Sequence, residues 1–163
     1  MKKILYLHGL ESQQGGKKEA FLSLNNFVWA PEVDYYKKDA LWNLIQKVEK
    51  FKPDLIIGSS MGGYFAENIA KMTNIEVLLL NPAHSWDVQE GYYIRVRSRK
   101  IGYKRTIVLG LQDDIVDPLI TKKMFNGRAN IIELEGIGHR IPFLNFVDIY
   151  NKYLLNEVTT NPK

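Results

Sequence analysis

Residues 58–63, GSSMGG, place two adjacent serines among glycines directly after a short apolar run. The pattern G-x-S-x-G fits when Ser60 is its centre, because a glycine then stands two residues away on each side. Centring the pattern on Ser59 would put Ile57 and Met61 where the glycines belong. If the motif carries a nucleophile, the spacing therefore assigns that role to Ser60.

A serine hydroxyl is a weak nucleophile near neutral pH, so it needs a base to take its proton and an acid to orient that base. His139 is the candidate base, because it ends the loop GIGH that follows the apolar run 130–134. Asp113 is the preferred acid, since it stands three residues past the glycine that ends an earlier run. Asp114 and Asp117 stay open as alternatives, although Asp114 could cap the next segment and Asp117 precedes a proline that can begin a helical turn.

Acyl transfer also needs backbone N–H groups that hold the developing oxyanion. Met61 is one candidate, because it directly follows the serine at the expected start of a helix. Leu10 is the second candidate and Glu11 the reserve, in the loop after the first apolar run. His8, Glu11 and His84 are candidates for contact with substrate. We interpret His8 mainly as a residue that holds the oxyanion loop by hydrogen bonding, and His84 as an exposed loop residue.

The elements that must position these residues follow from the hydrophobic pattern. Short apolar runs predict strands, and the intervening segments with helical spacing predict helices. Strands are expected at about residues 4–7, 27–30, 55–57, 76–80, 106–109 and 130–134. Helices are expected at about 17–25, from an N-cap at Asp39 to before Pro53, after the GSSMGG motif, and at about 141–155.

Strands this apolar, separated by helices, predict an α/β fold of three layers, with about six mostly parallel strands and helices on both faces. Open α/β sheets bind ligands beyond the carboxyl ends of their strands. Ser60, Asp113 and His139 each follow a predicted strand, so we expect them to meet at that edge. Their order along the chain, serine, aspartate, histidine, is the order expected for α/β-hydrolases.

The composition is that of an ordinary globular protein. The 163 residues, 45% hydrophobic and 25% charged, predict a single domain over 1–163. No apolar stretch is long enough to cross a bilayer or to serve as a signal peptide, so no membrane segment is expected. The absence of cysteine excludes disulfides and thiolate chemistry and fits the cytoplasm. No histidine pair has metal-ligand spacing, and neither a metal nor a cofactor is predicted.

The net charge of +4 comes partly from a basic segment at residues 95–105. A solvated positive face is the favoured interpretation of this segment, with binding of an anionic partner as the alternative. Residues 81–104 are the least regular part of the sequence. They are interpreted as a surface loop, with an active-site cover as the other candidate.

Five segments resemble one known family, the YqiA-like bacterial esterases, which are small α/β-hydrolases. The segments are ILYLHGLES at 4–12, IIGSSMGGYFA at 56–66, LLLNPA at 78–83, VLGLQDDIVDP at 108–118 and GIGH at 136–139. The resemblance implies a compact fold without a large cap domain and activity on short acyl esters. It assigns the nucleophile, acid and base to the same three residues, and the oxyanion donors to Leu10 and Met61.

The sequence therefore predicts a cytoplasmic carboxylesterase-type serine hydrolase that acts on a small-molecule ester through an acyl-enzyme. An acyl thioesterase with the same residues is the nearest alternative, with the basic 95–105 segment meeting an anionic carrier such as coenzyme A. A non-catalytic binding protein that uses this segment for nucleic acid is the rival from another class. It is disfavoured, because binding alone has no need of the serine, aspartate and histidine together, and no nucleic-acid module is present. No oligomeric state is predicted.

Overall fold

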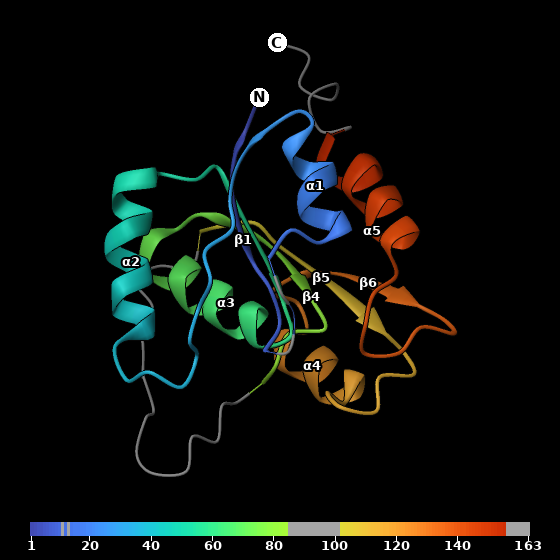
Figure 1. Cartoon of the computed structure of the whole chain (residues 1–163). Helices are drawn as coiled ribbons and strands as arrows, with labels where there is room; N and C mark the ends of the chain where they lie inside the picture. Colours follow the sequence, from blue (N-terminus) through green and yellow to red (C-terminus); the bar gives the residue numbers. More distant parts are fainter. Residues whose placement is uncertain (11, 13, 85–101, 156–163) are drawn as a thin grey trace.

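The computed structural model describes residues 1–10, 12, 14–84 and 102–155 (Figure 1). The strands are β1 (Lys3–Leu7), β2 (Phe27–Trp29), β3 (Leu55–Ser59), β4 (Glu76–Leu80), β5 (Arg105–Gly110) and β6 (Asn130–Leu134). The helices are α1 (Lys17–Ser23), α2 (Ala40–Phe51), α3 (Met61–Thr73), α4 (Pro118–Phe125) and α5 (Phe143–Ile149), with a π-helical segment, η1 (Tyr150–Leu155), after α5.

The six strands form one sheet in the order β2-β1-β3-β4-β5-β6, and every neighbouring pair is parallel. Parallel sheets need helical crossovers, which cover both faces of the sheet and so favour strands that are apolar on both sides. In β1, Leu5 and Leu7 pack into the core on one face, and Ile4 and Tyr6 pack into the core on the other. The predicted α/β fold with a mainly parallel sheet is confirmed.

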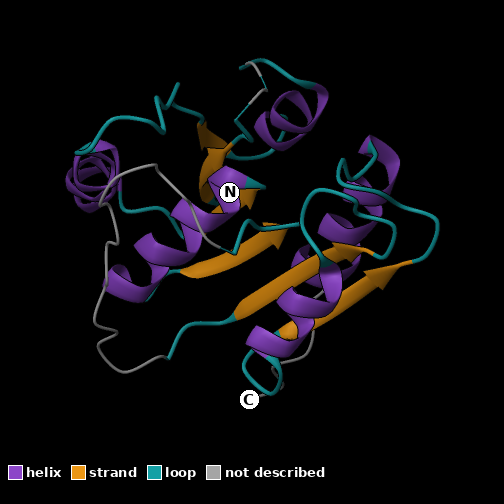
Figure 2. Ribbon diagram, turned by 90° about the horizontal axis from the view of Figure 1, so that it is seen from below, coloured by secondary structure: helices purple, strands orange, loops and turns teal. Residues whose placement is uncertain are grey.

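Helices lie on both faces of the sheet, so the fold has three layers (Figure 2). One layer holds α2 and α3, and Phe125 at the end of α4 packs against the same core. The other layer holds α1 and α5, which bury Leu22 and Phe146. The described residues form no large cap domain, as the family resemblance implied. That residues 1–163 form one domain stays a prediction.

The bounds of one predicted helix need correction. The last helix begins at Phe143 and not at Ile141, because Pro142 disfavours helical backbone at the residue before it. It then changes at Tyr150 into the π-helical segment. Asp39 stands at the N-cap of α2 but caps no backbone N–H; its Oδ2 accepts a hydrogen bond of 2.8 Å from the side chain of Asn43. For α4, the sequence predicted only a helical turn that begins at Pro118, whereas the structure has a helix over Pro118–Phe125.

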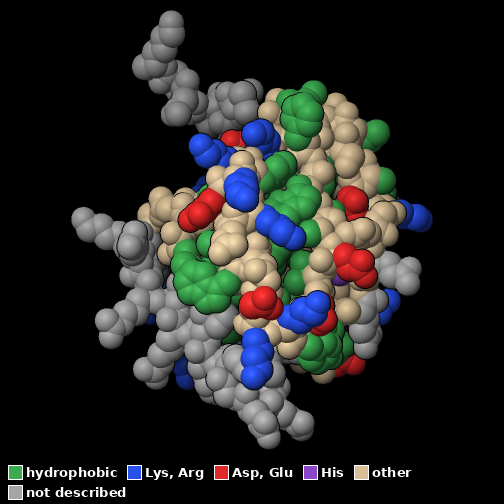
Figure 3. Space-filling model, turned by 60° about the vertical axis from the view of Figure 1, so that its left-hand side comes forward, with side chains coloured by type: hydrophobic (Ala, Val, Ile, Leu, Met, Phe, Trp, Pro, Cys, Tyr) green, Lys and Arg blue, Asp and Glu red, His purple; other side chains and the backbone are tan. Residues whose placement is uncertain are grey.

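Most of the irregular segment predicted at 81–104, namely residues 85–101, lies outside the described residues, and so does the greater part of the basic segment 95–105. On the face shown in Figure 3, basic and acidic side chains of the described residues are interspersed. None of the helices in the described ranges combines the length and the hydrophobicity that crossing a bilayer requires.

Candidate active site

Ser60 occupies a sharp turn between β3 and α3. Its backbone has φ 51° and ψ −116°, a region that costs energy for any residue with a side chain. A Cβ on Gly58 would collide with the backbone of Gly62, and a Cβ on Gly62 would collide with the carbonyl group of Leu7. The two glycines of the motif are therefore required, because the strand and the helix approach too closely for any side chain.

A chain of hydrogen bonds joins Ser60, His139 and Asp113. The Oγ atom of Ser60 lies 2.9 Å from Nε2 of His139, and Nδ1 of His139 lies 2.8 Å from Oδ2 of Asp113. A carboxylate only accepts hydrogen bonds, so Nδ1 carries the imidazole proton. The lone pair of Nε2 then faces the serine hydroxyl. In this tautomer the imidazole can take the serine proton.

Asp113 is held so that its carboxylate faces the imidazole. Its side chain is buried, and Oδ1 accepts hydrogen bonds of 2.9 Å from the backbone N–H groups of Ile115 and Val116. The two other candidate acids, Asp114 and Asp117, do not hydrogen-bond to His139 and lie in other environments. Asp114 is exposed, and Asp117 caps α4 by accepting a 2.8 Å hydrogen bond from a backbone N–H of that helix. Within the described ranges, Asp113 is the carboxylate that hydrogen-bonds to the histidine.

Asn81, at the end of β4, is a residue whose role the sequence analysis missed. It is 1% exposed, and its Nδ2 donates to the carbonyl oxygens of Gly138 and His139 at 3.0 and 2.8 Å. Its Oδ1 accepts a 2.8 Å hydrogen bond from the N–H of Gly110. Asn81 therefore ties together the loops that carry the histidine and the aspartate. The sequence feature that could have indicated this role is an amide side chain directly after a predicted buried strand, at the carboxyl edge of the sheet.

The two expected oxyanion donors flank the serine. Met61 is the first residue of α3, so its N–H has no acceptor within that helix. Leu10 lines the same cavity as the serine and the histidine. The loop before Leu10 is held by His8, whose Nδ1 donates to the Gly9 carbonyl oxygen at 2.9 Å and whose own carbonyl oxygen accepts a 2.6 Å hydrogen bond from Tyr35. Glu11, the reserve donor, lies outside the described residues.

His84, expected to be an exposed loop residue, is instead half-buried, and it does not contact the serine. Its Nε2 hydrogen-bonds to the hydroxyl of Thr121 on α4, and it lines neither of the two cavities beside Ser60. Burial lowers the pKa of His84, against the opposing effect of the charges of Asp117 and Asp113. In the described part of the chain, no three histidine, aspartate or glutamate side chains are grouped so that they could hold a metal ion.

Two adjoining cavities open beside Ser60. The first, of about 210 Å³, is lined by Leu10, Ile115, His139 and the serine itself, so it offers apolar walls next to the reactive groups. The second, of about 320 Å³, extends from there along the side of β1 that faces α1 and α5. His8 lines this second cavity.

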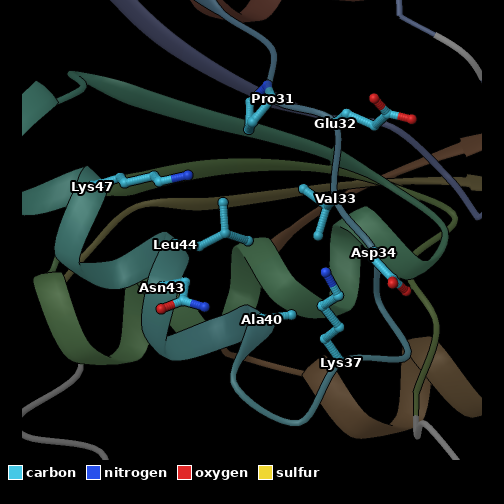
Figure 4. A pocket seen from close by; sticks show the side chains of 9 residues that line it. All are labelled: Pro31, Glu32, Val33, Asp34, Lys37, Ala40, Asn43, Leu44 and Lys47. Carbon is cyan, nitrogen blue, oxygen red and sulfur yellow. The ribbon is translucent and has the colours of Figure 1, made fainter.

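A larger cavity, of about 400 Å³, lies apart from these two (Figure 4). It is formed by the connection between β2 and α2 and by α2 itself. Its lining residues are Pro31, Glu32, Val33, Asp34, Lys37, Ala40, Asn43, Leu44 and Lys47. None of the predicted site residues lines it, so we locate the candidate active site by the hydrogen-bonded groups and not by cavity size.

Comparison with known proteins gives a family and a fold. The profile of the uncharacterised protein family UPF0227 matches residues 3–92. A search of curated proteins finds no match. Among solved structures, Est1E from Butyrivibrio proteoclasticus is 16% identical with a TM-score of 0.74, over 96% of this chain and 88% of that one.

Two further solved structures are similar. MGS-MChE2, an alpha/beta hydrolase enzyme from the metagenome of sediments of the Mar Chica lagoon in Morocco, is 18% identical with a TM-score of 0.70, over 96% of this chain and 90% of that one. The esterase domain of a Rhodothermus marinus protein is 13% identical with a TM-score of 0.67, over 96% and 85%. At such identities the likeness establishes the fold, and the predicted α/β-hydrolase fold is confirmed.

Proposed function

Because this chain belongs to the uncharacterised protein family UPF0227 and has the α/β-hydrolase fold, we propose that it is a serine hydrolase that cleaves carboxylic esters of short acyl chains. The observation that carries the proposal is the hydrogen-bond chain from Ser60 through His139 to Asp113. Ser60 also stands on a strained strand-to-helix turn, which is the usual setting of the nucleophile in this fold.

In the proposed reaction, Oγ of Ser60 attacks the ester carbonyl carbon while Nε2 of His139 takes the hydroxyl proton. The backbone N–H groups of Met61 and Leu10 hold the negative oxygen of the tetrahedral intermediate. The bond to the alcohol oxygen then breaks, and the protonated histidine gives its proton to the leaving alcohol. Water then attacks the acyl carbon while Nε2 of His139 takes its proton, the bond to Oγ of Ser60 breaks to release the carboxylic acid, and the histidine returns the proton to Oγ. Asp113 stabilises the imidazolium form throughout.

The small first cavity supports the preference for short acyl chains, since Leu10 and Ile115 give it apolar walls close to the serine. The same groups would act on a thioester. The anionic carrier was suggested by the basic segment 95–105, of which 95–101 lie outside the described ranges and Arg105 is buried against Glu67, so the proposal is an ester. No cofactor takes part in the proposed reaction. A cytoplasmic location belongs to the proposal as well, on the ground that the sequence has no cysteine.

The test is labelling with a fluorophosphonate probe, together with turnover of p-nitrophenyl acetate and butyrate. We expect the wild type to label and turn over, and Ser60→Ala to lose both. Ser59→Ala should keep the label, because the hydroxyl that hydrogen-bonds to His139 is that of Ser60. Ser23→Ala, at an exposed site on α1, is the control for serine removal. A wild type that neither labels nor turns over these esters would contradict the proposal and favour the binding-protein alternative.

A further inference from the structure

The second cavity beside Ser60 is placed to receive one arm of an ester. Gly9, Ser12 and Ser59 line both this cavity and the one that contains the nucleophile, so a ligand can extend from one into the other. The proposed acyl chain occupies the first cavity, whose walls are apolar. The alcohol arm, on the other side of the scissile carbonyl, then enters the second cavity. Its volume of about 320 Å³ is within the range of small-molecule sites.

The sheet contributes polar side chains to the wall of the second cavity. Tyr6 lies on β1 and His8 directly follows this strand, so their side chains point to the same face of the sheet. The parallel register pairs Tyr6 with Ile57, and Ser59, two residues further along β3, therefore stands beside His8. This is the face that α1 and α5 cover, and Tyr6 packs there against the core. Tyr6, His8 and Ser59 all line the second cavity.

These three polar groups have no hydrogen-bond partner in the described part of the chain. Tyr6 is only 9% exposed, yet its hydroxyl makes no hydrogen bond there, and neither does the hydroxyl of the half-buried Ser59. In His8, Nδ1 donates to the carbonyl oxygen of Gly9, so the buried Nε2 carries a lone pair that receives no donor. Buried polar groups are normally hydrogen-bonded, so three unpaired ones at a single cavity indicate a ligand or the water that it displaces.

The chemistry of the three groups matches neutral hydroxyls. Burial, together with the charge of Glu19, raises the pKa of Tyr6 to about 12, so its hydroxyl stays protonated and can both donate and accept. The hydroxyl of Ser59 can do the same, whereas Nε2 of His8 only accepts. A ligand hydroxyl complements all three, because it carries a proton to donate and lone pairs to accept with. The ring of Phe143 lines the same cavity and offers an apolar face to a carbon skeleton.

We propose that the second cavity binds the alcohol arm of an ester whose alcohol carries several hydroxyl groups, a polyol or a sugar. Tyr6 and Ser59 hydrogen-bond to these hydroxyls, and Nε2 of His8 accepts from the one that enters deepest. The second serine of the GSSMGG motif then binds the substrate next to the serine that attacks it. The inference rests on the proposed function and narrows its substrates to short-chain esters of polyhydroxylated alcohols.

Two matched pairs of butyrate esters, followed by titration of the released acid, test the hydroxyls and their source. Glycerol 1-monobutyrate carries two hydroxyls on an open chain, and 2-methylbutyl butyrate has methyl groups in their place. Glucose 6-butyrate carries hydroxyls on a ring, and cyclohexylmethyl butyrate is its match without them. We expect the wild type to give a higher kcat/KM for the hydroxylated member of at least one pair, and the responding pair distinguishes polyol from sugar. No such preference in either pair would overturn the inference.

Tyr6→Phe removes one hydroxyl and keeps the ring that packs in the core. It should lower the ratio of kcat/KM between the hydroxylated ester and its match about three- to tenfold, the effect of one lost hydrogen bond. Ser59→Ala should lower the ratio in the same way, while Ser60 still labels with the fluorophosphonate. Tyr150→Phe, which removes a buried hydroxyl from the same face of the sheet outside both cavities, is the matched control.

The outcomes of this series separate binding from a structural role. A ratio that neither Tyr6→Phe nor Ser59→Ala lowers in either pair would overturn the inference. The Tm of Tyr6→Phe should be no lower than that of the wild type, because the hydroxyl it removes has no partner in the described part of the chain. A lower Tm would show that this hydroxyl is bonded within the fold and would contradict the inference.

A binding measurement separates this inference from the proposed function. Glycerol 1-monobutyrate and glucose 6-butyrate are titrated into Ser60→Ala and into Ser60→Ala/Tyr6→Phe and followed by ligand-observed NMR, which needs no turnover. A Kd that rises about three- to tenfold for either ester on loss of the Tyr6 hydroxyl would support the inference even if the wild type hydrolysed no ester. An equal Kd in the two proteins for both esters would overturn it even if the wild type proved an active esterase.

Discussion

The strained backbone of Ser60 is held in place by its own peptide groups. Its N–H donates a 3.0 Å hydrogen bond to the carbonyl oxygen of Leu80, and its carbonyl oxygen accepts from the N–H groups of Tyr64 and Ala83. A positive φ at a serine costs about 1–3 kcal/mol, so it persists only where surrounding contacts impose it. These bonds point the hydroxyl out of the sheet and toward His139.

The substitution Asp113→Asn should prevent His139 from acting as the base. Asparagine is nearly the same size as aspartate, but its amide can donate to Nδ1 of His139, which favours the tautomer that cannot take the serine proton. We expect kcat for p-nitrophenyl butyrate to fall by about 10³- to 10⁴-fold, as in serine proteases with the same change. Asp114→Asn, at an exposed neighbour, is the control. A loss below about tenfold at position 113 would point to another acid.

The loops after β4, β5 and β6 have to converge for the active site to form. They are far apart in sequence, and the side chain of Asn81 joins all three through bonds to Gly110, Gly138 and His139. A buried amide with its donor and its acceptor both used holds loop positions more narrowly than apolar packing can. We therefore assign Asn81 a positioning role, because it acts on the reacting groups through the loops.

Asn81→Ala should loosen those loops and leave buried backbone groups unpaired. We expect the free energy of unfolding to fall by about 2–4 kcal/mol, since each unsatisfied buried group costs about 1–3 kcal/mol. We also expect kcat to fall more than KM rises, because the histidine loses its position. Urea denaturation and steady-state kinetics measure the two effects. Asn43→Ala, which removes an exposed side-chain hydrogen bond on α2, should change neither.

At the scale of the whole molecule, a buried ion pair ties the layer of α3 to the sheet away from the active site. Arg105, at the start of β5, is 4% exposed and binds both carboxylate oxygens of Glu67, at 2.9 and 2.7 Å. Its Nη1 donates a 2.8 Å hydrogen bond to the carbonyl oxygen of Arg128. Burial alone lowers the pKa of Arg105, but the hydrogen bonds and charge of Glu67 outweigh it and the pKa is raised.

Breaking this ion pair should destabilise the fold without changing the reactivity of Ser60. Arg105→Met removes the closest cation from the buried Glu67 carboxylate and leaves it the ion pair with Lys71 at 3.6 Å and the hydrogen bond from Tyr103, so we expect a loss of about 3 kcal/mol in the free energy of unfolding. The double variant Glu67→Met/Arg105→Met should lose less, because no buried charge remains. Urea denaturation gives both values, and labelling of the folded fraction should stay as in the wild type. Lys122→Met, at an exposed ion pair with Glu133, should cost under about 1 kcal/mol.

The sequence by itself determined the features that depend on neighbouring residues. Continuous apolar runs determined the strands, because both faces of a parallel sheet are buried. The spacing of glycines around Ser60 determined the turn, because the clash that excludes a side chain at Gly58 involves backbone four residues away. For the last helix, Pro142 marked a start that periodicity alone placed too early.

Only the tertiary structure decided which of three nearby aspartates hydrogen-bonds to His139, since that choice depends on the paths of two loops 26 residues apart. It also decided the role of Asn81, whose partners lie as far as 58 residues along the chain. The second cavity beside Ser60 likewise joins side chains of α1 to Arg140, near the other end of the sequence. Local patterns determine where an element forms, whereas hydrogen-bond geometry between distant segments exists only after the layers have packed.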